Sequence, residues 1–142
     1  MGRKRILLVD ADAELLRLLA VRCREIGLDV DTARDATSAV TWLDKRKPDL
    51  VCLDDELPGG GGLRLSEIVL KSPDDVACPV ILLTTRSQKG AAPSSPRMCV
   101  YRVQKRPDLW RFLEPVVHEL VDVRATRRST GGGGKGRTEH VS

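Results

Sequence analysis

Charged side chains follow three apolar segments that have the length of β-strands. Asp10 comes directly after residues 6–9, Asp54 is preceded by residues 50–53, and Lys105 follows Val103 by two positions. In open α/β sheets, ligands bind where the carboxyl ends of the strands meet. We therefore expect the side chains that close these strands to converge on one pocket at the edge of a sheet.

Apolar segments of strand length alternate with segments of helical periodicity along the chain. This alternation predicts an α/β fold of repeated βα units, with a parallel sheet that is covered by helices on both faces. Asp12 is a candidate N-cap for the first helix, with Gly27 as its stop, and Asp35 can cap the second. A third helix is expected over residues 63–71. The predicted strands cover residues 5–10, 28–33, 49–54, 79–84 and 99–104.

The segment that should hold the fourth helix is a poor helix former. Residues 86–98 include Pro93 and Pro96, and each proline lacks an N–H donor and clashes with the preceding turn of a helix. We expect a loop or one short turn there. The last helix can be capped by Asp108 and carries apolar residues at helical spacing, although Pro115 should bend its axis.

The charge of the chain is concentrated at its end. Of the 24 basic and 20 acidic residues, five basic residues and one acidic residue lie in residues 124–142, which leaves 19 of each sign in residues 1–123. The net charge of +4 therefore lies in the final segment, which also contains four consecutive glycines at 131–134. We expect a disordered, solubilising tail over 124–142, with binding of nucleic acid or an acidic partner as the less favoured interpretation.

The rest of the composition indicates how the domain is stabilised and in which compartment we expect it. The chain of 142 residues with 41% apolar content can bury a core without disulfide or metal staples. The four cysteines, Cys23, Cys52, Cys78 and Cys99, are too widely spaced for a CxxC pair, so we expect reduced structural thiols. Residues 6–9 are too short an apolar stretch for a signal peptide or a membrane span. We expect a cytoplasmic protein with no membrane partner.

Several linked motifs make residues 4–122 resemble the receiver domain of bacterial two-component response regulators. The motifs are residues 6–10, residues 48–54 with 57–59 after them, residues 79–84, and Lys105. Their order and spacing together are far more specific than any one of them. The resemblance implies a flavodoxin-like (βα)5 fold with a five-stranded parallel sheet, here with a short or absent fourth helix, over residues 1–123.

The resemblance also implies a chemistry for the site. Asp54 would be the phosphoacceptor, and Asp10, Asp54 and the backbone carbonyl of Glu56 would hold Mg²⁺, a hard cation that prefers oxygen ligands. Thr84 would bind a phosphoryl oxygen, and Lys105 would pair with the phosphoryl group. The donor would be a histidine kinase or a phosphotransfer protein, and the signal would pass to a downstream protein that the sequence does not identify.

The chain departs from the receiver pattern next to the metal site. Receivers usually place two adjacent acids after the first strand, whereas here Asp10 is followed by Ala11, which predicts weakened binding of Mg²⁺. Asp12 could reach the ion directly or through water, although a helix cap is the favoured interpretation. Arg102 stands where an aromatic switch residue is common, with Tyr101 as a weak substitute.

Two hypotheses follow. The first is a single-domain response regulator, because we expect no output domain after residue 123. Such a protein would be a phosphoacceptor rather than an enzyme, and its signal would leave by contact with another protein. The alternative is a pseudoreceiver, which keeps the fold but acts as a phosphorylation-independent interaction module. Ala11 and the proline-rich fourth helix segment favour the alternative.

Overall fold

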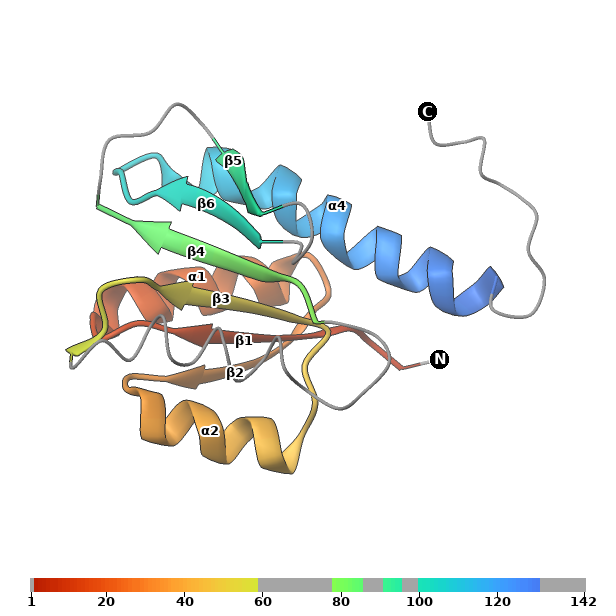
Figure 1. Ribbon diagram of the computed structural model, residues 1–142, viewed down its shortest axis with the longest axis horizontal. Helices are drawn as coiled ribbons and strands as arrows, with labels where there is room; N and C mark the ends of the chain where they lie inside the picture. The colour runs from red at the N-terminus through yellow and green to blue at the C-terminus, as the bar shows by residue number, and fades with distance from the viewer. Residues whose placement is uncertain (1, 59–77, 86–90, 96–99, 131–142) are drawn as a thin grey trace.

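The computed structural model describes residues 2–58, 78–85, 91–95 and 100–130. One sheet runs through the centre of the molecule, and its strands stand in the order β2-β1-β3-β4-β6-β5 (Figure 1). The strands are β1 (Arg5–Val9), β2 (Asp29–Ala33), β3 (Leu50–Asp54), β4 (Val80–Thr84), β5 (Ala91–Ser95) and β6 (Val100–Gln104). The described helices are α1 (Ala13–Glu25), α2 (Ala36–Lys45) and α4 (Leu109–Thr130).

The predicted five-stranded parallel sheet is confirmed. Strands β1, β2, β3, β4 and β6 pair in parallel, and β1, β2 and β6 are each followed by a described helix. The predicted strand over residues 99–104 corresponds to β6. Parallel strands that are buried on both faces read as continuous apolar runs, and β3 and β4 are buried along their whole length.

The expectation of a loop over residues 86–98 was wrong in its central part. Residues 91–95 form β5, which pairs antiparallel with β6 at the edge of the sheet. Pro93 lacks an N–H donor, and an edge strand tolerates this because only one of its sides is paired. The register shifts between Pro93 and Ser95. The predicted helix over residues 63–71 lies outside the described residues.

The predicted helix boundaries are set by local hydrogen bonds. The Asp12 carboxylate accepts from the backbone N–H groups of Glu14 and Leu15, at 3.0 and 3.2 Å, and so caps α1. The chain leaves α1 through Gly27, whose φ of 94° favours glycine. Asp35 accepts from the backbone N–H of Ser38 at 2.8 Å, a bond that lowers the pKa of the Asp35 carboxyl. These caps confirm the sequence-based assignment.

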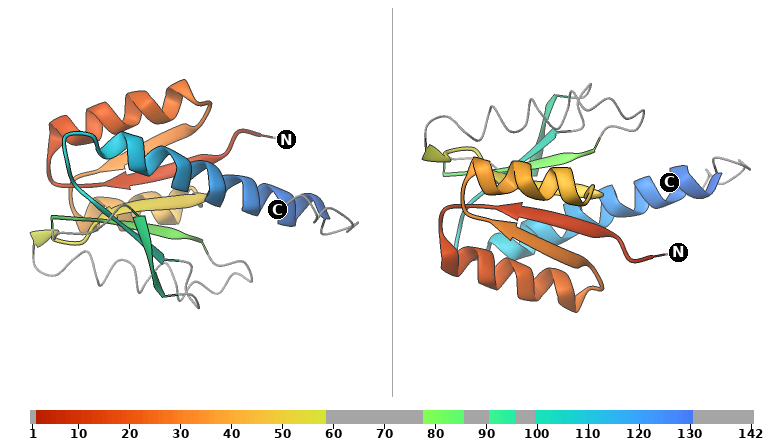
Figure 2. Two further views of the ribbon diagram at one scale, coloured as in Figure 1. Left: turned by 90° about the horizontal axis from the view of Figure 1, so that it is seen from above. Right: turned by 90° about the horizontal axis from the view of Figure 1, so that it is seen from below.

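The two faces of the sheet carry separate layers. Apolar residues of α1 and α4 form one core cluster with β1, β3, β4 and β6, and α2 packs on the opposite face with the alternate strand residues (Figure 2). Within α4, Leu113 is fully buried. The helix runs through Thr130, so the domain boundary predicted at residue 124 falls inside it. No helix within the described residues is long and apolar enough to cross a membrane.

Candidate functional site

Two carboxylates and one ammonium group meet at the carboxyl edge of the sheet. Asp10 follows β1, Asp54 ends β3, and Lys105 follows β6. Lys105 Nζ lies 2.8 Å from Asp10 Oδ2 and 3.2 Å from Asp54 Oδ2, so it bridges the two acids. Asp10 and Asp54 are only 2% and 5% exposed. The structure therefore brings together three of the residues that the sequence placed in one pocket.

The backbone orients both carboxylates. Asp10 Oδ1 accepts from the N–H of Asp12, and Asp54 Oδ1 accepts from the N–H of Glu56, each at 2.9 Å. A short acidic side chain that bonds the N–H two residues further on forms a compact turn of its own. This pattern leaves the Oδ2 atom of each carboxylate turned toward Lys105. The orientation of the Asp54 carboxylate is thus fixed by its own chain.

The charge state of Lys105 is set by its two partners. Burial works to lower the pKa of the ammonium group, but the hydrogen bond and the charge of Asp10, with a further contribution from Asp54, outweigh burial. The net effect raises the pKa of Lys105 above its usual value. The bridging group is therefore a full positive charge at neutral pH.

Thr84 and Glu56 border this pair of acids. Thr84 is 1% exposed at the end of β4, and its carbonyl accepts from the N–H of Lys105 at 2.7 Å. Asp54 lies opposite Leu83 in the sheet, so Thr84 is one residue beyond the partner of Asp54. Glu56 is exposed, and its Oε2 accepts from the Thr85 hydroxyl at 2.9 Å. The roles predicted for Thr84 and for the Glu56 carbonyl stay predictions.

The sequence pattern of the response regulator receiver domain matches residues 6–95 of the chain, well over half of its length. The chain belongs to the response regulator receiver domain family.

Curated relatives carry the receiver as one part of a longer protein. The DNA-binding response regulator MtrA of Mycobacterium tuberculosis is 36% identical over 85 residues, which cover 60% of this chain and 36% of MtrA. The phosphate regulon transcriptional regulatory protein PhoB of Klebsiella pneumoniae is 33% identical over 86 residues, which cover 61% of this chain and 38% of PhoB. The chain thus spans little more than a third of the length of these relatives.

Solved receiver structures share the fold. The response regulator protein TrrA of Thermotoga maritima, in complex with Mg²⁺-BeF, is 30% identical with a TM-score of 0.66, over 82% of this chain and 98% of TrrA. A CheY-like receiver domain from Methylobacillus flagellatus has a TM-score of 0.68 at 18% identity, over 84% of this chain and 99% of that domain. The second likeness concerns the fold alone.

The oxygen donors of this receiver suit Mg²⁺, although they are few. Asp10 and Asp54 supply buried carboxylate oxygens, the ligand type that this ion prefers. Within the described ranges, no group of three or more acidic, histidine or cysteine side chains is arranged so that it could hold a metal ion. Ala11 stands where a further acid is usual, and the side chain of Asp12 caps α1. The donor set therefore fits the ion with one carboxylate fewer than usual.

Asp12 would have to give up hydrogen bonds to bind a metal directly. Its Oδ1 accepts from two backbone N–H groups of the first turn of α1, and N-caps of this kind typically contribute about 1 kcal/mol. A contact through the other carboxylate oxygen, or through water, would leave the cap in place. The assignment of Asp12 to the metal stays a prediction.

Two contacts of this receiver were missed from the sequence. The Asp55 side chain is only 12% exposed, and its Oδ2 lies 3.6 Å from Arg102 Nη1. Arg34 donates to the carbonyl of Ala11, at 3.3 and 3.1 Å, and ties the end of β2 to the loop after β1. Asp55 follows β3 and Arg102 lies in the middle of β6, with β4 between the two strands, so no local sequence pattern links this pair.

Tyr101 does not lie on the same face of the sheet as Arg102. It packs against the cluster that includes α4, and its hydroxyl donates to Glu119 Oε2 at 3.4 Å. Neighbouring residues of a strand face opposite sides of a sheet, so Tyr101 is turned toward α4 while Arg102 contacts Asp55. The position usual for the aromatic switch is thus filled by an ion-pairing residue.

The described cysteines are free thiols, as predicted. Cys52 lies two residues before Asp54, and burial first, then the charges of Cys23 and Asp10, raises its pKa well above the usual value. Burial also raises the pKa of Cys23 to about 12. Both thiols therefore stay protonated and act as small apolar side chains. Cys99 lies outside the described residues.

Proposed function

We propose that this receiver accepts a phosphoryl group on Asp54 from a histidine kinase or a phosphotransfer protein, in a reaction that depends on Mg²⁺. The bridging contact of Lys105 with Asp10 and Asp54 carries this proposal, because it places a nucleophile, a charge-neutralising cation and a candidate metal ligand together. The protein would act as a phosphoacceptor rather than as an enzyme on small molecules. The output would be altered binding to a downstream protein.

The chemistry follows from the placement of these groups. A carboxylate oxygen of Asp54 attacks the phosphorus atom of the donor, the P–O bond of an acyl phosphate forms, and the bond to the donor breaks with its electron pair. Lys105 offsets the negative charge that spreads over the transferring oxygens. Asp10 and Asp54 would hold Mg²⁺, which would neutralise more of this charge. Thr84 would then hydrogen-bond a phosphoryl oxygen and favour one conformation of its loop.

A pseudoreceiver is the second candidate. It is favoured by the balance of charge in the pocket, since Lys105 already contacts both acids and Ala11 supplies no further carboxylate. Under the pseudoreceiver hypothesis, the pocket is an ion-pair cluster that stabilises the fold, and the domain binds its partners without being phosphorylated. DNA binding belongs to the name of MtrA, of which the match covers only 36%.

The change Ala11→Asp separates the two candidates. A second carboxylate beside Asp10 would add an oxygen ligand, so we expect the Mg²⁺ concentration for half-maximal phosphorylation to fall about tenfold, the scale on which single metal-site groups usually act. The measurement is the rate of phosphorylation by acetyl phosphate, followed by mass spectrometry over a range of Mg²⁺ concentrations. The wild-type chain should reach the same final extent at high Mg²⁺.

The matched control is Asp12→Ser, which keeps a side chain that can cap α1 but removes the carboxylate. An unchanged Mg²⁺ dependence in this variant would assign Asp12 to the cap alone. If the Ala11→Asp variant is phosphorylated at saturating Mg²⁺ and the wild-type chain is not, the pseudoreceiver is the correct account.

A further inference from the structure

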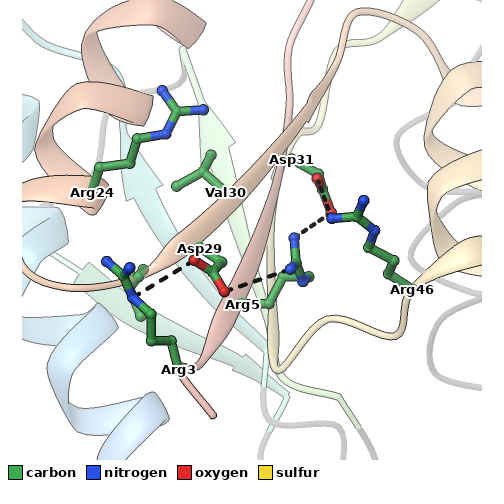
Figure 3. Close-up of a pocket in the computed structure, with 8 residues that line it drawn as sticks. Arg3, Arg5, Arg24, Asp29, Val30, Asp31 and Arg46 are labelled. Carbon is green, nitrogen blue, oxygen red and sulfur yellow. Dashed lines mark hydrogen bonds and ion pairs between the residues drawn. The ribbon is translucent and has the colours of Figure 1, made fainter.

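A second charged site lies at the opposite edge of the sheet from Asp54. It is a hollow of about 350 Å³ at the amino ends of β1 and β2, and small-ligand sites in proteins start at about 300 Å³. Four arginines and two aspartates line it, with Leu28 and Val30 as an apolar wall. We call it the arginine hollow, and its charged residues are Arg3, Arg5, Arg24, Arg46, Asp29 and Asp31 (Figure 3).

The acids of the arginine hollow do not balance its arginines. The four guanidinium groups face two carboxylates, which leaves an excess of two positive charges. Asp29 is shared by Arg3 and Arg5, and Asp31 is shared by Arg5 and Arg46. Arg24 makes no ion pair with any described residue. A cavity with such an excess attracts anions.

Most of these ion pairs are too long to be hydrogen bonds. Arg3 Nε and Arg5 Nη2 lie 3.6 and 3.5 Å from the Asp29 carboxylate, and Arg46 Nη1 lies 3.9 Å from Asp31 Oδ1. Only Arg5 Nη1, at 3.1 Å from Asp31 Oδ2, is within ordinary hydrogen-bond distance of an acid. Because each guanidinium group carries five N–H donors, most of the donors here are left for a ligand or for water.

The arrangement suits adjacent phosphoryl groups. Figure 3 shows Arg3 and Arg24 on one side of Val30, and Arg5 and Arg46 on the other. A guanidinium group binds two oxygens of one phosphate through parallel N–H bonds, so two pairs of arginines match two linked phosphates better than one. Asp29 links Arg3 of the first pair to Arg5 of the second, and Asp31 links Arg5 to Arg46, so the two acids position three of the four arginines.

We propose that the arginine hollow binds a small molecule that carries two linked phosphoryl groups, independently of phosphorylation at Asp54. The shared chemistry is that of a diphosphate, which could be free pyrophosphate or part of a nucleoside diphosphate. Binding should weaken as salt is added, because the side chains of Arg3 and Arg46 are 61% and 52% exposed and their charges are screened.

The test is isothermal titration calorimetry of the whole chain with sodium pyrophosphate and with ADP, at low ionic strength and with EDTA to keep Mg²⁺ out of the Asp54 site. Arg24→Gln and Arg46→Gln should each weaken binding about tenfold, the scale expected for one charge-assisted contact. Arg17→Gln is the matched control, because Arg17 is exposed on α1 and lies outside the hollow. This control should change the affinity less than twofold.

Further measurements distinguish free pyrophosphate from a nucleoside diphosphate as the ligand, and the arginine hollow from the Asp54 site. Equal affinities would identify the pyrophosphate group as the whole ligand, and a tighter ADP complex would show that the wall of Leu28 and Val30 contributes. The Asp54→Asn variant should bind like the wild-type chain whether or not Asp54 is a phosphoacceptor. The proposal is overturned if neither ligand binds, or if Arg17→Gln weakens binding as much as Arg24→Gln in variants that circular dichroism shows to be folded.

Discussion

The Lys105→Met variant should lose about 3 kcal/mol of unfolding free energy at neutral pH, because it leaves two buried carboxylates without their shared cation. Asp10 and Asp54 are nearly inaccessible to water, and their Oδ2 atoms both face the ammonium group. Methionine keeps the length of the side chain but not its charge. Urea unfolding, monitored by circular dichroism, measures the loss.

A second substitution tests the cause of this loss. In the Lys105→Met background, Asp10→Asn removes one of the two facing charges, so it should restore a large part of the stability. Addition of Mg²⁺ should also stabilise the single variant if the ion binds the folded state. If Lys105→Met is as stable as the wild-type chain, the burial of Asp10 and Asp54 does not require the charge of this lysine.

The contribution of Lys105 has a defined pH range. Folding raises its pKa above the ordinary value of 10.5, so its stabilising effect is complete below that pH and is lost as the pH rises through the folded-state pKa. The difference between the wild-type chain and Lys105→Met should therefore stay constant from neutral pH to about pH 10 and shrink above it. A difference that shrinks between pH 7 and 9 would contradict this assignment.

The Leu113→Ala variant should lose about 3 kcal/mol of unfolding free energy, within the range for fully buried leucines. Leu113 is 0% exposed and belongs to the cluster that joins α4 to the sheet. The receiver pattern matches only residues 6–95, so this variant asks whether α4 is an integral part of the domain. Urea unfolding of both proteins gives the difference.

Leu18→Ala is the matched control for this experiment. Leu18 is 51% exposed on α1, so the same truncation there should cost less than about 0.5 kcal/mol. A loss below about 1 kcal/mol for Leu113→Ala would show that α4 packs on the sheet only weakly.

The sequence predicted the parallel sheet because β1, β3 and β4 contain uninterrupted apolar runs, the first two of them closed by Asp10 and Asp54. Asp12, Gly27 and Asp35 marked the helix boundaries correctly. Each works through its own backbone conformation or through hydrogen bonds to residues two or three positions away, so the sequence alone reveals it. The presence of Pro93 also correctly predicted that this segment is not a helix. It could not show β5, because an edge strand is made by pairing with β6, a contact that leaves little trace in residues 91–95 themselves.

The candidate site was predictable in its members but not in its contacts. The positions of Asp10, Asp54 and Lys105 follow from strand ends, whereas the bridging of both acids by one lysine depends on the side-chain conformation that the fold imposes. The pairing of Asp55 with Arg102 and the arginine hollow join residues from separate strands and helices. Such contacts require the three-dimensional arrangement, and single charges in a sequence resemble ordinary surface residues.

The most direct test of phosphoryl acceptance is the intact mass of the chain after incubation with acetyl phosphate, with and without Mg²⁺, beside the Asp54→Asn variant. We expect a gain of one phosphoryl group that requires Mg²⁺ and is absent from the variant, because Asp54 supplies the attacking oxygen. No gain at high Mg²⁺ in a folded protein, or a gain that persists in Asp54→Asn, would contradict the assignment of Asp54 as the phosphoacceptor.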